Sequence, residues 1–318
     1  MLFELAYPGL CAWAVMRRIA GRPVPAGPMF AFRAIRGRMR RYELSALAAL
    51  NPRWGAWLAL HRFERMVPKC AETPAGSSGL AERRFGPMDG PKVLLLHGWN
   101  ARSDMMLPLA LELAARGARV IVPDLPGEGR NPAQPMSFDA KARILAAQYR
   151  SEAIQTVVGH SAGGLIAALA VETGLHRARL ITICAPYSME TLLQAYLFRI
   201  GAPETLETPL MSHIARRDGR DAARMGPELY AAMGARLLVI HARRDWQVRL
   251  SEAEAICAVA PAASLQVLEN CNHHTIMADP GLFDAVATAV LPVKTPRPCD
   301  TSTARVCRRA AITGAQPC

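Results

Sequence analysis

One stretch of the chain, residues 156–168, constrains the fold more than any other. A β-branched run leads straight into a turn of small residues, and Ser161 stands at the centre of the turn. Gly159 and Gly163 bracket this serine in a G-x-S-x-G pentapeptide, which gains meaning in a strand–turn–helix context. A Cβ at either glycine would collide with the neighbouring strand and helix. The pattern predicts a sharp turn that exposes the Ser161 hydroxyl; an ordinary strand-to-helix turn is the alternative.

Two downstream segments offer the partners that a serine nucleophile needs. An apolar strand pattern at 236–240 is followed by a loop that carries Asp245, and a shorter pattern at 264–268 is followed by His273 and His274. A serine hydroxyl becomes a strong nucleophile only when a base takes its proton, and a carboxylate orients that base. The chain order is therefore serine, aspartate, histidine, with each residue beyond the end of its own predicted strand.

This order and three further motifs resemble the α/β-hydrolase superfamily. Residues 93–99 look like the strand and His-Gly turn that supply part of the family's oxyanion hole, and residues 120–130 look like its D-x-P-G-x-G segment. Residues 272–280 look like its G-H-x-x-I/L ending, with Asn272 where glycine is commoner. Asparagine tolerates the left-handed turn conformation, so the loop can survive this replacement. The resemblance covers about residues 79–291.

The resemblance implies a mechanism for these residues. In its register His273 is the general base and His274 is the alternative. His273, oriented by Asp245, would take the Ser161 proton as the hydroxyl attacks a carbonyl, which gives an acyl-enzyme that water cleaves. This chemistry needs no metal and no organic cofactor.

Other polar residues near these motifs receive different roles. The backbone N–H groups of Trp99 and Ala162 are the expected oxyanion donors. His97 and His160 are expected to be structural, with hydrogen bonds near the oxyanion hole. Asp124 is expected to fix the turn after its strand, because Asp followed by Pro and Gly is turn chemistry.

The remaining chain alternates between two patterns, which predicts an α/β fold with a doubly wound, mostly parallel sheet. Residues 80–88 are expected to form a first strand. The other strand patterns occupy 92–96, 119–123, 154–158, 180–184, 236–240 and 264–268. The helical patterns between them occupy about 104–116, 138–150, 162–174, 251–260 and 281–291.

The connection 186–234 is too long for a simple crossover. Apolar residues recur in it at three- and four-residue spacing, and Gly201 ends the predicted helix. The resemblance makes this insertion a helical lid, whose Leu193, Tyr196 and Leu197 would line the substrate pocket; the alternative is that they dock the helix on the core. Because a carboxylate that orients an imidazole belongs at a strand end, three acids of the insertion are not expected to replace Asp245: Glu190, Asp218 and Asp221.

The distribution of charge and cysteine limits the partners. Of the net charge of +12, residues 1–41 carry +7 and residues 291–318 carry +4, so the catalytic motifs lie in a nearly neutral stretch. A nucleic-acid enzyme would carry its basic surface beside its catalytic motifs, so no nucleic-acid partner is predicted. The eight cysteines form no Cys-x-x-Cys pair, which predicts no structural metal and favours a reduced, cytoplasmic setting.

The chain is expected to have three parts: a basic helical extension (1–78), the catalytic domain (79–291) and a disordered tail (292–318). Residues 30–41 alternate apolar and cationic side chains as an amphipathic helix does. This helix either caps the hydrolase core with its arginines in water, or residues 1–41 contact the inner face of a membrane peripherally. The apolar run 5–16 is too short to span a bilayer.

These observations predict a serine hydrolase that cleaves a small-molecule carboxylic ester, a thioester or a small amide. An acyltransferase that passes the same acyl group to an alcohol or thiol is an alternative, and a non-catalytic ligand-binding relative is another. The second alternative gives no reason to retain all of Ser161, Asp245 and His273.

Overall fold

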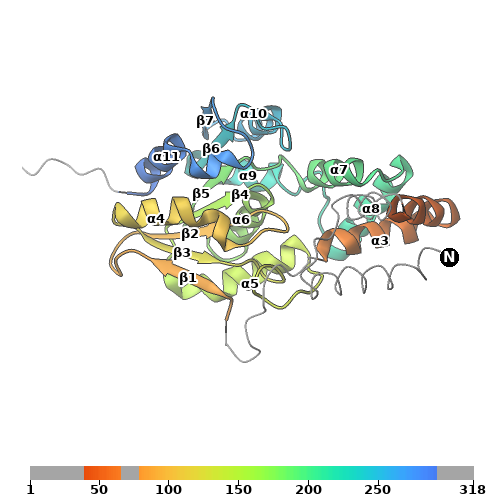
Figure 1. Ribbon diagram of the computed structural model, residues 1–318, viewed down its shortest axis with the longest axis horizontal. Helices are drawn as coiled ribbons and strands as arrows, with labels where there is room; N and C mark the ends of the chain where they lie inside the picture. The colour runs from red at the N-terminus through yellow and green to blue at the C-terminus, as the bar shows by residue number, and fades with distance from the viewer. Residues whose placement is uncertain (1–38, 66–78, 292–318) are drawn as a thin grey trace, which may run out of the picture.

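A seven-stranded sheet organises the part of the chain that the computed structural model describes, residues 39–65 and 79–291 (Figure 1). Its strand order is β1-β3-β2-β4-β5-β6-β7, and every neighbouring pair is parallel except β1 with β3. The strands are β1 (Glu82–Phe85), β2 (Lys92–Leu96), β3 (Arg119–Pro123), β4 (Thr156–His160), β5 (Arg179–Ile183), β6 (Leu237–Ala242) and β7 (Ser264–Leu268). The sheet is therefore doubly wound and mostly parallel, as the alternating patterns predict.

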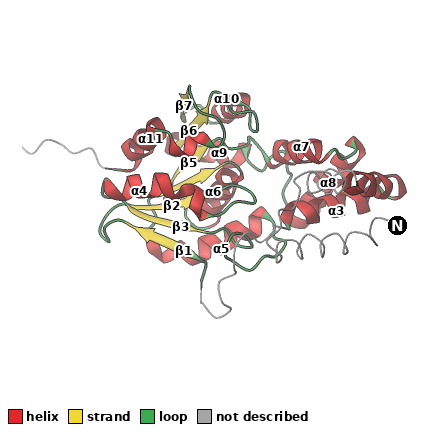
Figure 2. Cartoon of the chain, in the orientation of Figure 1, coloured by secondary structure: helices red, strands yellow, loops and turns green. Residues whose placement is uncertain are grey.

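Helices cover both faces of this sheet (Figure 2), which explains why the central strands β2, β4 and β5 are almost entirely buried. In β2, Leu94 and Leu96 pack into one buried cluster, while Val93 and Leu95 pack into the cluster on the other face. The first cluster includes side chains of α5 (Phe138–Tyr149), α6 (Ala162–Thr173) and α10 (Leu250–Val259), and the second includes side chains of α4 (Leu107–Ala115) and α11 (Pro280–Val290). Short 3-10 helices complete the connections: η1 (Ser103–Met106), η2 (Arg150–Glu152), η3 (Glu204–Leu206), η4 (Gly234–Arg236) and η5 (Thr275–Ala278).

Strand β4 differs from its predicted position by two residues. The apolar pattern predicts a strand at 154–158, whereas β4 runs from Thr156 to His160. Its pairing with β5 continues through His160, which lies opposite Ile183. The strand thus extends directly to the serine turn, and Ser161 N–H continues the pairing by donating to the Ile183 carbonyl at 2.8 Å.

The inserted segment folds into three helices: α7 (Met189–Ile200), α8 (Glu207–Asp218) and α9 (Pro227–Met233). Helix α7 begins with a capping box between Ser188 and Thr191 and ends at Gly201, whose φ of 65° favours glycine. The helix and its glycine stop match the sequence pattern. Leu193, Tyr196 and Leu197 all lie on its buried side.

Part of the N-terminal extension packs on this insertion. Residues 39–50 are helical, and α3 (Pro52–Glu64) follows after Asn51, which caps α3 by accepting a hydrogen bond from Arg53 N–H. Figure 1 shows α3, α7 and α8 together at one end of the molecule. Arg217 of α8 donates to Glu64 at 2.7 Å, and the Tyr196 hydroxyl donates to the Ala59 carbonyl at 3.2 Å. The cap beside the sheet is therefore built from two segments far apart in the sequence.

Several expectations fall outside the described residues. They concern residues 1–38, which include most of the amphipathic segment 30–41, the end of the extension at residues 66–78, and the tail 292–318. The division of the chain into three parts stays a prediction. No helix in the described part of the chain has the length and apolar character needed to cross a membrane.

Candidate active site

Ser161 lies in the strained turn between β4 and α6. Its backbone has φ 55° and ψ −130°, a conformation that costs free energy and persists only where the surroundings enforce it. A Cβ at Gly159 would lie 2.2 Å from the Gly163 carbonyl oxygen, and one at Gly163 would lie 2.3 Å from the His97 oxygen. Both glycines are therefore required by the close approach of α6 to β4 and to the turn after β2. Ser161 itself is partly exposed.

Asp245 and His273 meet beyond the ends of β6 and β7. His273 Nδ1 lies 2.6 Å from Asp245 Oδ2, and both side chains are buried. The other carboxylate oxygen, Oδ1, accepts hydrogen bonds from the N–H groups of Gln247 (2.8 Å) and Val248 (2.9 Å). Burial raises the pKa of Asp245, but the hydrogen bonds and the charge of His273 outweigh it, so the net pKa lies below its usual value. The carboxylate is thus ionised and fixed in orientation.

The His274 side chain lies beside Gln247 and not beside Asp245. It is exposed, and its Nε2 lies 2.7 Å from Gln247 Nε2, so it makes no contact with the carboxylate that holds His273. The side chain of Asn272 fixes this loop by accepting hydrogen bonds from the N–H groups of His274 (3.0 Å) and Thr275 (3.1 Å). Asn272 is not among the residues with positive φ. Asn272 therefore stabilises the loop by forming an Asx turn. It does not adopt the left-handed conformation that the sequence suggests.

His160, the residue before the serine, braces His273. Its Nε2–H donates to the His273 carbonyl at 2.8 Å, and the two rings lie 4.8 Å apart. Burial lowers the pKa of His160 to about 3, so its ring is neutral at ordinary pH. Within the described residues no hydrogen bond joins Ser161 Oγ to His273. Such bonds are often long in unliganded enzymes and tighten when substrate binds.

Two backbone N–H groups are available to an oxyanion beside Ser161. Ala162 is the first residue of α6, and Trp99 lies in the turn after β2; neither N–H donates to another group of the described chain. The two turns are in close contact, since a Cβ at Gly98 would lie 3.2 Å from Ser161 Cβ. The geometry fits the oxyanion role that the resemblance implies for Trp99 and Ala162.

His97 links the Trp99 turn to the segment after β3 by two hydrogen bonds. Its Nδ1–H donates to the Gly98 carbonyl at 2.9 Å, and its Nε2 accepts from Leu125 N–H at 2.9 Å. Because both ring nitrogens are engaged and burial lowers the pKa of His97, the ring is a neutral structural link between β2 and the segment after β3.

Asp124 fixes that segment, as the turn chemistry predicts. Its carboxylate accepts from Ser103 N–H at 2.6 Å and from Arg130 Nε at 2.7 Å, and it is buried. A second buried ion pair, between Glu128 and Lys141, ties the same segment to α5. A buried pair of this kind is costly to break from one side, because the remaining charge would be unpaired.

An aromatic cluster from four segments covers the Trp99 turn. Phe63 of α3 stacks on Trp99 with ring centroids 5.2 Å apart, and Tyr196 of α7 contacts both rings, at 5.1 Å from Phe63 and 5.7 Å from Trp99. Phe138 of α5 lies 5.8 Å from Phe63. Trp99 Nε1–H donates to the Phe63 carbonyl at 2.8 Å, so α3 sets the orientation of this indole. The sequence did not indicate Phe63, because apolar spacing in α3 predicts only a helix and not its partner.

The described residues contain one group of side chains that could hold a metal ion: Cys184, His241 and Asp245, whose ligand atoms lie within 4.8 Å of one another. Two of the three are already engaged. Asp245 accepts from His273, and His241 Nε2–H donates to the Val248 carbonyl at 3.0 Å. Burial and the nearby Asp245 raise the pKa of the Cys184 thiol, which keeps it neutral. A metal ion here would compete with the Asp245–His273 pair, so the group fits a support for Asp245 better than a metal site.

Buried neutral histidines make the stability of the fold depend on pH. Burial lowers the pKa of His97, His160 and His241 below the unfolded value of about 6.5. The unfolded chain therefore binds more protons below that pH, so the stabilisation is complete above it and is lost as the pH falls towards the folded pKa. For His160 alone, urea denaturation is expected to show a loss of about 1.4 kcal/mol in unfolding free energy between about pH 7.5 and 5.5. His97 and His241 act in the same direction.

The matched variant is His160→Gln, whose amide can still donate to the His273 carbonyl. It should show a smaller loss between the two pH values than the wild type, by about the contribution of one histidine. An unfolding free energy that stays constant, or a loss that the variant leaves unchanged, would contradict the neutral state of His160.

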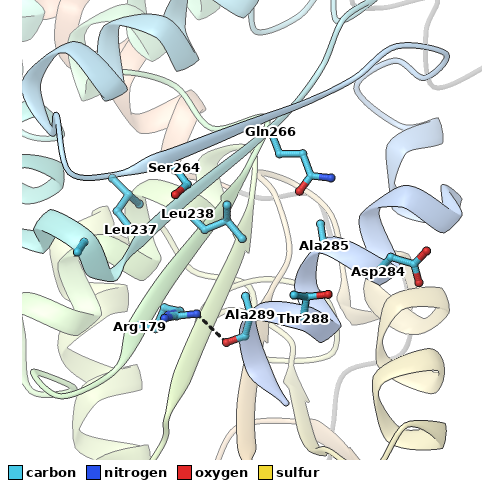
Figure 3. A pocket seen from close by; sticks show the side chains of 10 residues that line it. Arg179, Leu237, Leu238, Ser264, Gln266, Asp284, Ala285, Thr288 and Ala289 are labelled. Carbon is cyan, nitrogen blue, oxygen red and sulfur yellow. Dashed lines mark hydrogen bonds between the residues drawn. The ribbon is translucent and has the colours of Figure 1, made fainter. Parts of the chain in front are cut away.

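A surface depression of about 460 Å³ (Figure 3) has none of Ser161, Asp245 and His273 in its lining. Its lining includes the first residues of three strands, Arg179 of β5, Leu237 of β6 and Ser264 of β7, together with residues of α11. It therefore lies at the amino ends of the strands, whereas Asp245 and His273 follow their carboxyl ends. Ligands of open α/β sheets bind at the carboxyl edge, so the depression is not part of the candidate active site.

Comparison with known proteins identifies relatives of this chain. The sequence model of a protein family, described as the alpha/beta hydrolase family, matches residues 93–286. Pimeloyl-acyl-carrier-protein methyl ester esterase of Chromobacterium violaceum is 46% identical over 79 residues, which cover 24% of this chain and 30% of that protein. The magnesium-chelatase 30 kDa subunit of Rhodobacter capsulatus is 42% identical over 101 residues, which cover 29% and 34%. The chain thus spans about a third of the length of these curated relatives.

Among solved structures, an esterase from Exiguobacterium antarcticum is similar, with a TM-score of 0.50 and 21% identity. The similarity covers 66% of this chain and 94% of that one. At an identity this low, the structural similarity shows a shared fold and does not assign a substrate.

Proposed function

We propose, on the premise that this chain belongs to the alpha/beta hydrolase family, that it is a serine hydrolase that cleaves a carboxylic ester through an acyl-enzyme on Ser161. One observation carries the proposal: the 2.6 Å contact of His273 Nδ1 with the ionised, buried Asp245, next to a strained and partly exposed serine. A histidine held in this way keeps its Nε2 lone pair free to accept a proton.

The reaction follows from these positions. His273 Nε2 takes the proton of Ser161 Oγ as the oxygen attacks the ester carbonyl, and Asp245 stabilises the imidazolium that forms. The N–H groups of Trp99 and Ala162 donate to the tetrahedral oxyanion. When the intermediate collapses, His273 returns its proton to the departing alcohol. Water then attacks the acyl-enzyme by the same route, releases the acid and restores Ser161.

The surroundings of Trp99 suggest the substrate class. Phe63 and Tyr196 border the oxyanion turn with apolar surface, and Leu193 lies on the buried side of α7 near them. These side chains are almost fully buried, so they would line an acyl site only when α7 moves, and an apolar acyl group would then fit them better than a charged one. The Chromobacterium relative is named for the cleavage of a methyl ester, which supports an ester over an amide.

The name of the Rhodobacter relative describes no ester hydrolysis, so a ligand-binding role is the competing function. The geometry favours catalysis. Burying Asp245 and holding Ser161 in a strained conformation both cost free energy, and a binding protein gains nothing from either.

Labelling with a fluorophosphonate probe tests the proposal. The wild type is expected to be labelled, Ser161→Ala to show no labelling, and Ser251→Ala, at an exposed serine of α10, to be labelled like the wild type. A series of p-nitrophenyl esters of increasing chain length then reports the acyl preference. Absence of labelling in folded wild-type protein, or full labelling of Ser161→Ala, would refute the proposal. Turnover that rises with the concentration of an added alcohol at constant ester would instead indicate an acyltransferase.

A further inference from the structure

The helical hairpin formed by residues 39–50 and α3, called here the N-terminal hairpin, carries large apolar side chains on two faces. It lies outside the segment that matches the family model. The inner face, which includes Leu44 and Ala48 of the first helix and Ala59 and Phe63 of α3, belongs to the buried core. A surface helix of a globular protein needs one such face, with polar residues opposite.

The outer face of the hairpin also carries large apolar side chains. On the first helix, Tyr42 and Leu50 are 72% and 78% exposed, and Met39 lies three residues before Tyr42. On α3, Trp54 and Trp57 are 61% and 53% exposed, and their three-residue spacing places them on one side of the helix. Burying large aromatic and aliphatic side chains is favourable, and residues 39–65 and 79–291 supply no cover for these side chains.

The charge around this face is positive. Residues 39–65 contain five arginines against two glutamates, and the two glutamates are paired, Glu43 with Arg62 and Glu64 with Arg217. Arg40 and Arg53 are exposed and have no described carboxylate as a partner. The sequence before the hairpin, residues 1–38, adds six arginines against one glutamate. The described hairpin thus carries more cationic than anionic side chains.

We infer that the outer face of the N-terminal hairpin docks on an anionic lipid bilayer. Tryptophan and tyrosine favour the boundary between headgroups and acyl chains, where an apolar ring and a polar atom are both accommodated. Arginines beside them bind lipid phosphates and are attracted to a negatively charged surface. Exposed aromatic side chains on a cationic hairpin match an anionic bilayer surface, whereas a second copy of the hairpin would bring like charges together. The inference does not depend on the proposed esterase activity.

Flotation of the full chain with lipid vesicles tests the inference. The wild type is expected to float with vesicles of phosphatidylcholine and phosphatidylglycerol, to float less with phosphatidylcholine alone, and to be released by high salt. In the variant Trp54→Ser/Trp57→Ser the bound fraction is expected to fall roughly tenfold or more. Leu111→Ser, which replaces an exposed leucine of α4, is the matched control and should bind like the wild type. The charge variant Arg40→Glu/Arg53→Glu should lose binding to the anionic vesicles.

Three results would overturn the inference. The first is wild-type protein that floats with neither vesicle, and the second is Trp54→Ser/Trp57→Ser protein that floats like the wild type. The third is a wild-type dimer in solution that this variant converts to a monomer while no vesicle binding occurs, which would make the face an interface between copies. Both tryptophans are largely exposed, so an unchanged unfolding temperature verifies that the variant is folded. Flotation measures binding and not hydrolysis, so its outcome is separate from that of the labelling experiment.

Discussion

Replacing His273 by alanine is expected to lower kcat for an ester substrate by a factor on the order of 10⁶, whereas His274→Ala is expected to change it less than about tenfold. The two residues are adjacent in sequence and both follow β7, but they face different partners. His273 Nδ1 contacts Asp245 at 2.6 Å, while His274 Nε2 contacts Gln247 at 2.7 Å in an exposed position. Only His273 can therefore be oriented as a base.

The measurement is kcat for the same p-nitrophenyl ester in the wild type and both alanine variants, with circular dichroism to verify the fold. His274→Ala serves as the matched control because it removes the same side chain one residue away. A large loss of activity in His274→Ala with little loss in His273→Ala would reverse the assignment. Comparable activity in all three proteins would remove histidine catalysis at this loop altogether.

Much of the fold could be predicted because its determinants are local. Parallel strands buried on both faces leave continuous apolar runs, and β2 and β3 lie where those runs are. Strand β7 also lies at its predicted position, although it is a largely exposed edge strand. The serine turn could also be predicted from the sequence, since only glycine fits at positions 159 and 163. The end of α7 at Gly201 is of the same kind, because a positive φ selects the residue directly.

The remaining features depend on contacts that local patterns do not encode. Phe63 and Trp99 are 36 residues apart, and nothing in the spacing of either segment indicates that α3 orients the Trp99 indole. The brace from His160 to the His273 carbonyl spans 113 residues. The position of Cys184 next to Asp245 depends on β5 and β6 being neighbours in the sheet. These contacts arise from packing, which overrides or adds to sequence preference.

The N-terminal hairpin and the inserted segment form the cap together. The sequence separates a basic extension from a lid within 186–234, yet Glu64 pairs with Arg217 and Phe63 packs with Tyr196. The extension therefore contributes to the wall around the oxyanion turn as well as to the outer surface. Any movement of α7 that admits substrate must break or carry along its contacts with α3.

Replacing Asp245 by asparagine is expected to lower kcat about 10⁴-fold while leaving the fold intact. The structure gives a specific reason. The N–H groups of Gln247 and Val248 both donate to Oδ1, so the asparagine carbonyl oxygen will occupy that position. Its NH₂ group must then face His273 Nδ1, which can accept from it only in the tautomer with the proton on Nε2. In that tautomer His273 has no lone pair directed at Ser161 and cannot take its proton.

The matched control is Asp221→Asn, on the inserted segment, where the side chain accepts from Ala223 N–H at 2.9 Å. It should retain activity within severalfold of the wild type, and Asp245→Asn should retain the unfolding temperature of the wild type within a few degrees. An Asp245→Asn variant with nearly full kcat would show that the tautomer of His273 is set by another group. His241 Nε2 lies 3.9 Å from Asp245 Oδ2, so Asp245→Asn/His241→Ala would then be the variant to measure.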